Sequence, residues 1–263
     1  MNFTQLEKAI NLQISEVRQS LSIAIHTQDG HIHINAAKKR KAASLAKIPI
    51  LIEAFRLMEK NELTPEKLIF IEKPAMVGGS GVISYLSDSN IQSYRNLLEL
   101  MIIVSDNTAS NLLLDTIGMD NINKLAQRLN CKQTIMKRKF MDKQAQLDGH
   151  ENHTSAKDMI TFLKLISESN DFLTDRSRKQ MLAILSNQQF KNKLAKNINE
   201  ADQIKIYHKS GELQGVEHEA AIYKYREKKA EVAILSEGWT RNGSAQYYIA
   251  EIGRLLIEYF TKK

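Results

Sequence analysis

The sequence has few of the residues that mark several protein classes. Its one cysteine, Cys131, excludes an internal disulfide and a cysteine-based metal cluster in a chain of 263 residues. The three prolines and eleven glycines form no linker. No apolar run approaches the roughly 18 residues that span a bilayer, so we expect no transmembrane segment. Cys131 is then best interpreted as a small, buried or half-buried apolar side chain.

Aromatic residues are also scarce, which bears on the excess of positive charge. The formal net charge is +7 and the most basic stretch is Lys38–Lys41, yet aromatic residues make up only 6% of the chain and do not interleave with the basic clusters. No recognisable nucleic-acid-binding module accompanies that stretch. We therefore expect no nucleic-acid partner and interpret Lys38–Lys41 as a solvated segment. A weaker alternative is that the positive field draws in carboxylate-bearing substrates.

The seven histidines do not predict a metal site. His31 and His33 lie on one face of a predicted strand, but no Glu-flanked partner at helical spacing follows them. His218 is followed by Glu219 but not by the second histidine that a zinc-protease helix requires. We therefore expect neither a metal nor another cofactor.

Alternating apolar and polar residues occur near both ends of the chain, and helical periodicity fills the middle. A hairpin is predicted over 22–35 around a Gln-Asp-Gly turn. The other predicted elements are strands at 203–208, 217–225 and 230–236, terminal amphipathic helices at 3–21 and 244–259, and mainly helix over 44–195.

This order of elements predicts an α/β fold of the α+β type. A mainly antiparallel five-stranded sheet would be flanked by the terminal helices, with an all-helical domain inserted between its second and third strands. The sheet-and-helix domain would comprise residues 1–43 plus 196–263, and the insert residues 44–195. We expect the site in the crevice between them.

Three short motifs carry hydroxyl, amine and amide groups. Residues 44–47 read Ser-Leu-Ala-Lys, residues 105–107 read Ser-Asp-Asn, and residues 209–211 read Lys-Ser-Gly. No other serine of the chain has a lysine three residues later, as Ser44 has in Lys47. An active-serine enzyme that uses lysine in place of histidine needs this set of groups. Together the motifs predict nucleophilic catalysis at Ser44.

Ser44 and Lys47 have the placement that such chemistry requires. Ser44 lies at a predicted helix start, where free backbone N–H groups and the helix dipole favour developing negative charge. Lys47 returns to the same face of the helix. It can act as a base only when neutral, so its pKa must be lowered by burial or by a second cation such as Lys209. The plainer alternative makes Ser44 a helix N-cap and Lys47 a surface side chain.

These motifs resemble the signature of the class A β-lactamases and the penicillin-binding proteins. Residues 43–50 are similar to the nucleophile helix of class A, including the proline after the lysine, and residues 101–113 are similar to the class A pattern along their length. The stretch 208–211 has serine where threonine is commoner, and keeps the hydroxyl. The similarity extends from about Val17 to the C-terminus. It independently implies the arrangement of a sheet domain and a helical insert.

The resemblance implies roles for the second motif. Ser105 would pass a proton to the departing nitrogen, and Asn107 would bind a substrate amide and steady Lys47. The plainer alternative is that residues 105–107 cap a helix over 108–117, with Asp106 as the capping residue.

The resemblance also implies roles for the third motif. Lys209 and Ser210 would hold the substrate carboxylate at a strand edge, and Gly211 would leave room for the substrate to lie alongside as an added strand. The backbone N–H groups of Ser44 and Glu212 would form an oxyanion hole. The plainer alternative is a strand-end turn at 209–211.

One part of the class A pattern is absent. The family carries a Glu-x-x-Leu-Asn stretch between the second and third motifs, whose glutamate activates the deacylating water. The corresponding residues 140–152 contain no such stretch, and their carboxylates, Asp142, Asp148 and Glu151, have no matching spacing. We therefore predict ready acylation and slow turnover of penicillins.

The first hypothesis is a β-lactamase-like serine hydrolase that β-lactams or related acyl-D-amino-acid amides acylate at Ser44. Two alternatives are a peptidase or esterase that acts on cell-wall-type peptides, and a penicillin-binding module without turnover. We expect a monomer with a small-molecule or peptide substrate. The first eight residues lack the pattern of a signal peptide, which leaves the compartment open: cytoplasmic for a complete chain, extracytoplasmic if a leader has been removed.

Overall fold

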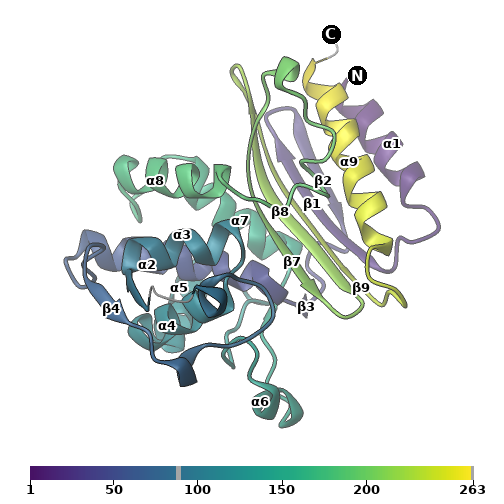
Figure 1. Cartoon of the computed structure of the whole chain (residues 1–263). Coiled ribbons are helices and arrows are strands. Elements are labelled where there is room, and N and C mark those ends of the chain that lie inside the picture. Colours follow the sequence, from purple (N-terminus) through teal and green to yellow (C-terminus); the bar gives the residue numbers. More distant parts are fainter. Residues whose placement is uncertain (87–89, 262–263) are drawn as a thin grey trace.

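The computed structural model describes residues 1–86 and 90–261. Its main sheet is antiparallel and five-stranded, in the order β2-β1-β9-β8-β7 (Figure 1). The strands are β1 (Leu21–Thr27), β2 (Gly30–Ile34), β7 (Lys205–Leu213), β8 (Val216–Tyr225) and β9 (Lys228–Glu237). The strand predicted over 203–208 is longer than expected, because β7 pairs with β8 from Lys205 to Leu213. Residues 209–211 therefore lie inside an edge strand rather than at a strand-end turn.

Two helices at the chain ends cover one face of the sheet, α1 (Phe3–Gln13) and α9 (Ser244–Thr261) (Figure 1). Leu6 and Ile10 of α1 are fully buried with Ile252 of α9 in the core on this face. The prediction of one helix over 3–21 was wrong in extent. Residues 14–20 form successive turns, and the Asn35 amide donates to the carbonyls of Arg18 and Leu21, so the chain bends directly into β1.

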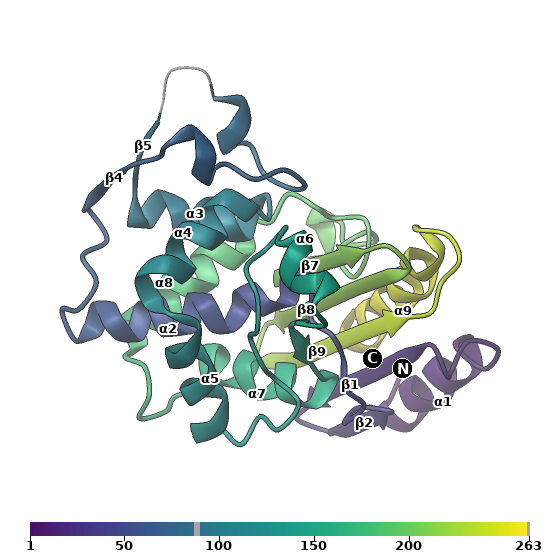
Figure 2. The same ribbon diagram turned by 90° about the horizontal axis from the view of Figure 1, so that it is seen from below.

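The segment between β2 and β7 forms the helical part of the molecule on the other side of the sheet (Figures 1 and 2). Its central helix is α2 (Lys47–Glu59), in which every residue from Lys47 to Leu57 is buried. A 3-10 turn, Ala43–Ala46, precedes it. Around α2 lie α3 (Tyr94–Ile103), α4 (Asn107–Ile117), α5 (Met119–Arg128), α6 (Lys143–Leu147), α7 (Ala156–Ser167) and α8 (Asp175–Ser186). Of these, α7 packs against β1, β8 and β9.

Two small antiparallel ladders within this part were not predicted. One pairs β3 (Arg40–Lys41) with β6 (His153–Thr154), and the other pairs β4 (Leu68–Phe70) with β5 (Ile91–Ser93). Short 3-10 turns occur at Lys73–Ala75, Ile83–Tyr85 and Glu200–Asp202. Strands of two or three residues give too short an alternation to be recognised from sequence.

The basic stretch 38–41 is not wholly a solvated segment. Arg40 is 4% exposed, its guanidinium donates to Ser22 Oγ and to the Gln19 carbonyl, and it lies 3.7 Å from the Glu237 carboxylate. A buried guanidinium needs such partners, so Arg40 anchors the chain to β1 and β9. The interpretation of a solvated segment was wrong for this residue.

The predicted fold is confirmed: a five-stranded antiparallel sheet with terminal helices on one face and a mainly helical segment on the other. Cys131 is 4% exposed, as expected of a small apolar side chain. In the described ranges, no helix combines the length and the apolar character needed to cross a membrane. The division into residues 1–43 plus 196–263 and 44–195 stays a prediction.

Candidate active site

The first motif spans the junction of a 3-10 turn and a helix. Ser44 lies in the turn and is half-buried, whereas Lys47 is the first residue of α2 and has no exposed surface. Ala43 has a positive φ of 47°, which is uncommon outside glycine, and the Ala42 N–H donates to the Asn152 carbonyl at 2.7 Å. This hydrogen bond holds the residue before the turn, in which Ser44 is partly exposed, whereas Lys47 is directed inward.

The second motif surrounds the Lys47 amine. Lys47 Nζ donates to the Ser105 carbonyl at 2.6 Å, to Ser105 Oγ at 3.0 Å and to Asn107 Oδ1 at 2.9 Å. Ser105 has a φ of 56°, a left-handed conformation, and thereby turns both of its oxygens toward Lys47. The motif thus supplies all three acceptors of Lys47 in the part of the chain that the structure describes.

Asp106 has a structural task within the same motif. Its carboxylate caps α4 by accepting from the Ala109 N–H at 2.9 Å, and it also accepts from the backbone of Val82 and Ile83. The Asn107 amide donates to the Gly78 carbonyl at 3.1 Å. A Cβ on Gly81 would lie 2.3 Å from Asp106, so only glycine lets this loop approach. The contacts with which Asp106 caps α4 therefore also hold the segment that carries Ser105 and Asn107.

The third motif brings a second amine to Ser105. Lys209 Nζ donates to Ser105 Oγ at 3.0 Å and to the Ser210 carbonyl at 2.7 Å, and Lys209 has no exposed surface. The Ser105 hydroxyl therefore lies between the amines of Lys47 and Lys209, which come from elements far apart in the sequence.

Burial and like charges lower the pKa values of both amines. Burial, and then the charge of Lys209, hold the pKa of Lys47 well below its ordinary value, although Asp106 opposes the shift. Burial and the charge of Lys193 lower the pKa of Lys209 to about 7, against Glu219 and Glu212. These are the two causes that the sequence predicted for Lys47, burial and Lys209.

Gly211 allows β7 to approach the nucleophile turn. A Cβ on Gly211 would lie 3.2 Å from both the Ser44 and Leu45 backbone nitrogens, which is tighter than ordinary packing. Sequence reasoning expected the glycine to leave room for substrate. The contact observed is with the backbone of the turn that carries Ser44, so Gly211 sets the spacing between that turn and Glu212.

The aromatic ring of Phe140 lies beside the Lys47 amine. Its centroid lies 4.6 Å from Lys47 Nζ. Asn111 holds the Phe140 backbone in two hydrogen bonds, accepting from its N–H at 2.8 Å and donating to its carbonyl at 3.0 Å. Sequence reasoning treated Phe140 only as the start of a loop, because no local pattern marks a ring that contacts a residue 93 positions earlier.

The three carboxylates of 140–152 are engaged elsewhere. Asp142 caps α6, Asp148 accepts from Gln144, and Glu151 pairs with Arg138 at 2.7 Å. The Arg138 and Glu151 side chains are 8% and 13% exposed, so this ion pair is largely buried and joins the two ends of the loop over 138–151. None of the three makes a hydrogen bond or an ion pair with a residue of the three motifs within the described ranges.

Lys193 is a further site residue that sequence reasoning missed. Its side chain has no exposed surface, and its amine donates to the Glu212 carboxylate. The second half of the chain contains many lysines, and nothing in the sequence around Lys193 indicates that this one is buried. Its charge nevertheless reaches Lys209, since it contributes to the lowered pKa of that residue.

Two cavities meet at Ser44. The larger, of about 520 Å³, includes Asn107, Phe140 and Met141 in its lining, and the smaller, of about 470 Å³, includes Ser105, Phe190 and Ser210. Both are also lined by Ser44, Ser80 and Glu212. The structure thus brings all the predicted site residues to one region, and their catalytic and binding roles remain predictions.

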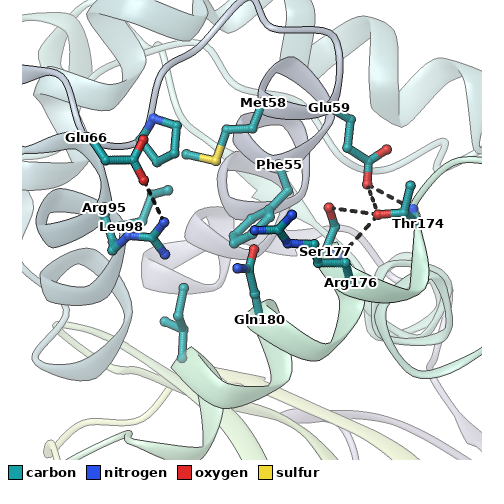
Figure 3. Close-up of a pocket in the computed structure, with 12 residues that line it drawn as sticks. Phe55, Met58, Glu59, Glu66, Arg95, Leu98, Thr174, Arg176, Ser177 and Gln180 are labelled. Atoms are coloured by element: carbon teal, nitrogen blue, oxygen red, sulfur yellow. Dashed lines mark hydrogen bonds and ion pairs between the residues drawn. The ribbon is translucent and has the colours of Figure 1, made fainter.

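Another cavity, of about 310 Å³, lies between α2, α3 and α8 (Figure 3). Arg95 at its wall is paired with Glu66, and Glu59 accepts from Thr174. No residue of the three motifs lines it. Because none of the three motifs reaches this cavity, and Arg95, Glu66 and Glu59 already have partners in its wall, we do not assign the active site to it.

Comparison with known proteins places these features in context. The sequence model of the Beta-lactamase enzyme family matches residues 5–260. No curated protein matches significantly. A β-lactamase from Sphaerobacter thermophilus has a similar structure, with a TM-score of 0.89 and 25% identity over 98% of this chain and 97% of that one.

Two further solved structures share the fold at lower identity. PBP-A has a TM-score of 0.86 at 21% identity, covering 100% of this chain and 98% of that one. An ancestral class A β-lactamase has a TM-score of 0.83 at 19% identity, covering 95% and 100%. A variant of PBP-A in which a leucine is replaced by glutamate has been solved as an acyl-enzyme complex with penicillin G.

Proposed function

Because the chain belongs to the β-lactamase enzyme family, we propose that it is an active-serine hydrolase that β-lactams or related acyl-D-amino-acid amides acylate at Ser44, with slow deacylation. The observation that carries this proposal is the environment of Lys47. Its amine is buried between Ser105, Asn107 and the Phe140 ring, with a lowered pKa and no carboxylate of 140–152 bonded to it in the described ranges.

In the acylation step, neutral Lys47 serves as the base for Ser44. A neutral amine has two N–H donors and one lone pair. The Ser105 carbonyl and Asn107 Oδ1 can only accept, so they take the two N–H groups, and in the neutral state the Ser105 hydroxyl, 3.0 Å away, donates to the lone pair instead of accepting. The lone pair becomes available to the Ser44 proton when the Ser105 hydroxyl turns away from it. Ser44 Oγ then attacks the carbonyl carbon as its proton passes to Lys47.

The negative charge of the tetrahedral intermediate needs donors that are already in place. We assign these to the backbone N–H groups of Ser44 and Glu212, which β7 and the nucleophile turn bring together at Gly211. When the amide bond breaks, the departing nitrogen takes a proton from Ser105 Oγ. Ser105 is reprotonated by Lys47, to which it is hydrogen-bonded, and the base is neutral again.

Deacylation requires a second base to activate water, and here the support is for a slow step. The Phe140 ring beside Lys47 has no lone pair to accept a proton and excludes water from its surface. Asp142 and Glu151 are held by the α6 N-terminus and by Arg138. The acyl-enzyme would therefore persist.

A peptide substrate is a second candidate, favoured by the position of β7. This strand is the edge of the sheet next to Ser44, and an edge strand can pair with an extended peptide. A peptidase or esterase with β-lactams as mimics would use the same acylation groups. A penicillin-binding module without turnover is the limiting case in which deacylation does not occur at all.

Intact mass spectrometry tests the proposal. Protein mixed with benzylpenicillin should gain one penicilloyl adduct, which remains over many minutes. Ser44→Ala should abolish the adduct, whereas Ser80→Ala, a serine that lines the same two cavities, should keep it. Absence of both adduct and hydrolysis, or an adduct that survives Ser44→Ala, would refute acylation at Ser44.

A further inference from the structure

The side chain of Glu212 lies where the two cavities beside Ser44 meet. It follows the third motif directly on β7, lines both cavities, and is 53% exposed. The oxyanion hole would use only its backbone N–H. The Glu212 carboxylate lines the space that a ligand would fill, and the oxyanion hole does not explain why a charged side chain lies there.

Lys193 fixes the orientation of this carboxylate. The Lys193 amine, which has no exposed surface, donates to Glu212 Oε1. A buried ammonium that lost this partner would be strongly destabilising, so the ion pair is held in place. Within residues 1–86 and 90–261, the second oxygen, Glu212 Oε2, has no hydrogen-bond or ion-pair partner. It is free to accept from a ligand.

The charge of Glu212 acts on the groups around Ser44. It raises the pKa of Lys209, which shows that the two charges are close enough to interact. A ligand cation in the same space would be attracted by Glu212, and a ligand anion would be repelled. The smaller cavity contains Ser105 and Ser210, the residues proposed to act on the departing nitrogen and the substrate carboxylate, so the acyl side of a ligand would occupy the larger cavity. A cation on that side would thus lie within the field of Glu212.

We propose that the Glu212 carboxylate determines specificity by favouring acyl donors that carry an ammonium group on the acyl side of the bond attacked by Ser44. This rests on the proposed acylation of Ser44. The substrate class is then an amino-bearing acyl amide, such as a peptide with a free amine next to the scissile acyl group. The carboxylate held by Lys209 and Ser210 is common to all such ligands and does not contribute to this selection.

Two penicillins separate the effect of the ammonium group from everything else. Ampicillin differs from benzylpenicillin by one amino group on the acyl side chain, which is protonated at about pH 6. The second-order rate constants for adduct formation, measured by intact mass at low ionic strength, give an ampicillin-to-benzylpenicillin ratio. In Glu212→Gln that ratio should fall about two- to fivefold, the range expected of a partly exposed ion pair. About 1 M NaCl should reduce the difference.

The substitution is conservative and has a matched control. Glu212→Gln keeps the backbone N–H and an oxygen acceptor for Lys193. Glu62→Gln changes the net charge equally at an exposed position that lines neither cavity, and should leave the ratio unchanged. Adducts with an unchanged ratio in Glu212→Gln, or an equal change in Glu62→Gln, would overturn the role of Glu212 alone. No adduct with either penicillin would overturn the proposed acylation and this inference with it.

Discussion

On the side of Ser44 formed by α4 and β7, amines and hydroxyls are joined by hydrogen bonds, whereas on the side formed by residues 131–152 a phenyl ring covers the Lys47 amine. On the first side, the amines of Lys47 and Lys209 each lie 3.0 Å from Ser105 Oγ. The second offers Phe140, with the nearby carboxylates turned to other partners.

This difference separates two chemical steps that a fast hydrolase must combine. Proton transfer from Ser44 needs a neutral amine, which burial supplies on the first side. Removal of the acyl group needs a base for water, which an aromatic ring on the second side cannot be. Under the proposed function, the groups for acylation gather on the first side, and the second side offers no base for hydrolysis among the described residues.

The largest expected effect is on the amine side. Lys47→Met keeps the length and apolar stem of the side chain but removes the base. The rate constant for penicillin adduct formation should fall by about 10²- to 10⁴-fold, the usual contribution of a positioned general base. Stopped-flow or quenched mass measurements would detect this. A rate within a few-fold of wild type would mean that another group takes the Ser44 proton.

The reverse change adds a base to the apolar side. Phe140→Glu should shorten the lifetime of the penicilloyl adduct about 10- to 100-fold, because the Asn111 clamp on the backbone holds the new carboxylate near Lys47. Adduct decay followed by intact mass is the measurement. Phe140→Leu, which stays apolar, is the control and should leave the lifetime long. Equal lifetimes in both variants would contradict the proposal that the Phe140 ring limits deacylation.

A smaller effect is expected at Gly211, where β7 approaches the turn that carries Ser44. In Gly211→Ala the added methyl group presses on the Ser44 and Leu45 nitrogens, so the nucleophile turn and β7 must move apart by a few tenths of an ångström. We expect adduct formation to slow about tenfold, because the oxyanion donors are misplaced. A Cβ on Gly78 would meet no atom within 4 Å, so Gly78→Ala is the matched control. Identical rates in the two variants would contradict the spacing role.

The smallest expected effect is a shift in pH dependence. Protonated Lys209 attracts a substrate carboxylate, and its pKa of about 7 predicts that adduct formation with benzylpenicillin declines as pH rises through that value. Lys193→Met removes the cation that lowers this pKa, so the decline should move to higher pH. Lys191→Met, in the lining of the smaller cavity, should leave it in place. A profile unchanged by Lys193→Met would exclude this coupling.

Much of the fold and the first side of the site could be predicted from the sequence. Alternating runs predicted the five strands, and the three motifs predicted Lys47, Ser105 and Lys209, which the structure joins by hydrogen bonds at Ser105 Oγ. Ser44 lines the cavities beside them. Burial and Lys209 were both expected to lower the pKa of Lys47, as they do. Local pattern and chemistry suffice where the residues that come together lie in recognisable motifs.

The rest depends on contacts between distant segments, which no local pattern marks. Phe140 and Lys193 look like ordinary loop residues until the fold brings them to Lys47 and Glu212. The left-handed φ of Ser105 has no local signal, because neither glycine nor asparagine stands at that position. The turns over 14–20 likewise have a distant partner, because the Asn35 amide donates to the Arg18 carbonyl.

Burst kinetics with the chromogenic cephalosporin nitrocefin test the separation of the two steps most directly. With protein at micromolar concentration, the account predicts a rapid release of about one equivalent of product per Ser44, followed by a much slower steady rate. Ser44→Ala should show neither phase. Many fast turnovers without a burst would contradict the account, because they would require an efficient base for deacylation on the side of the site that Phe140 occupies.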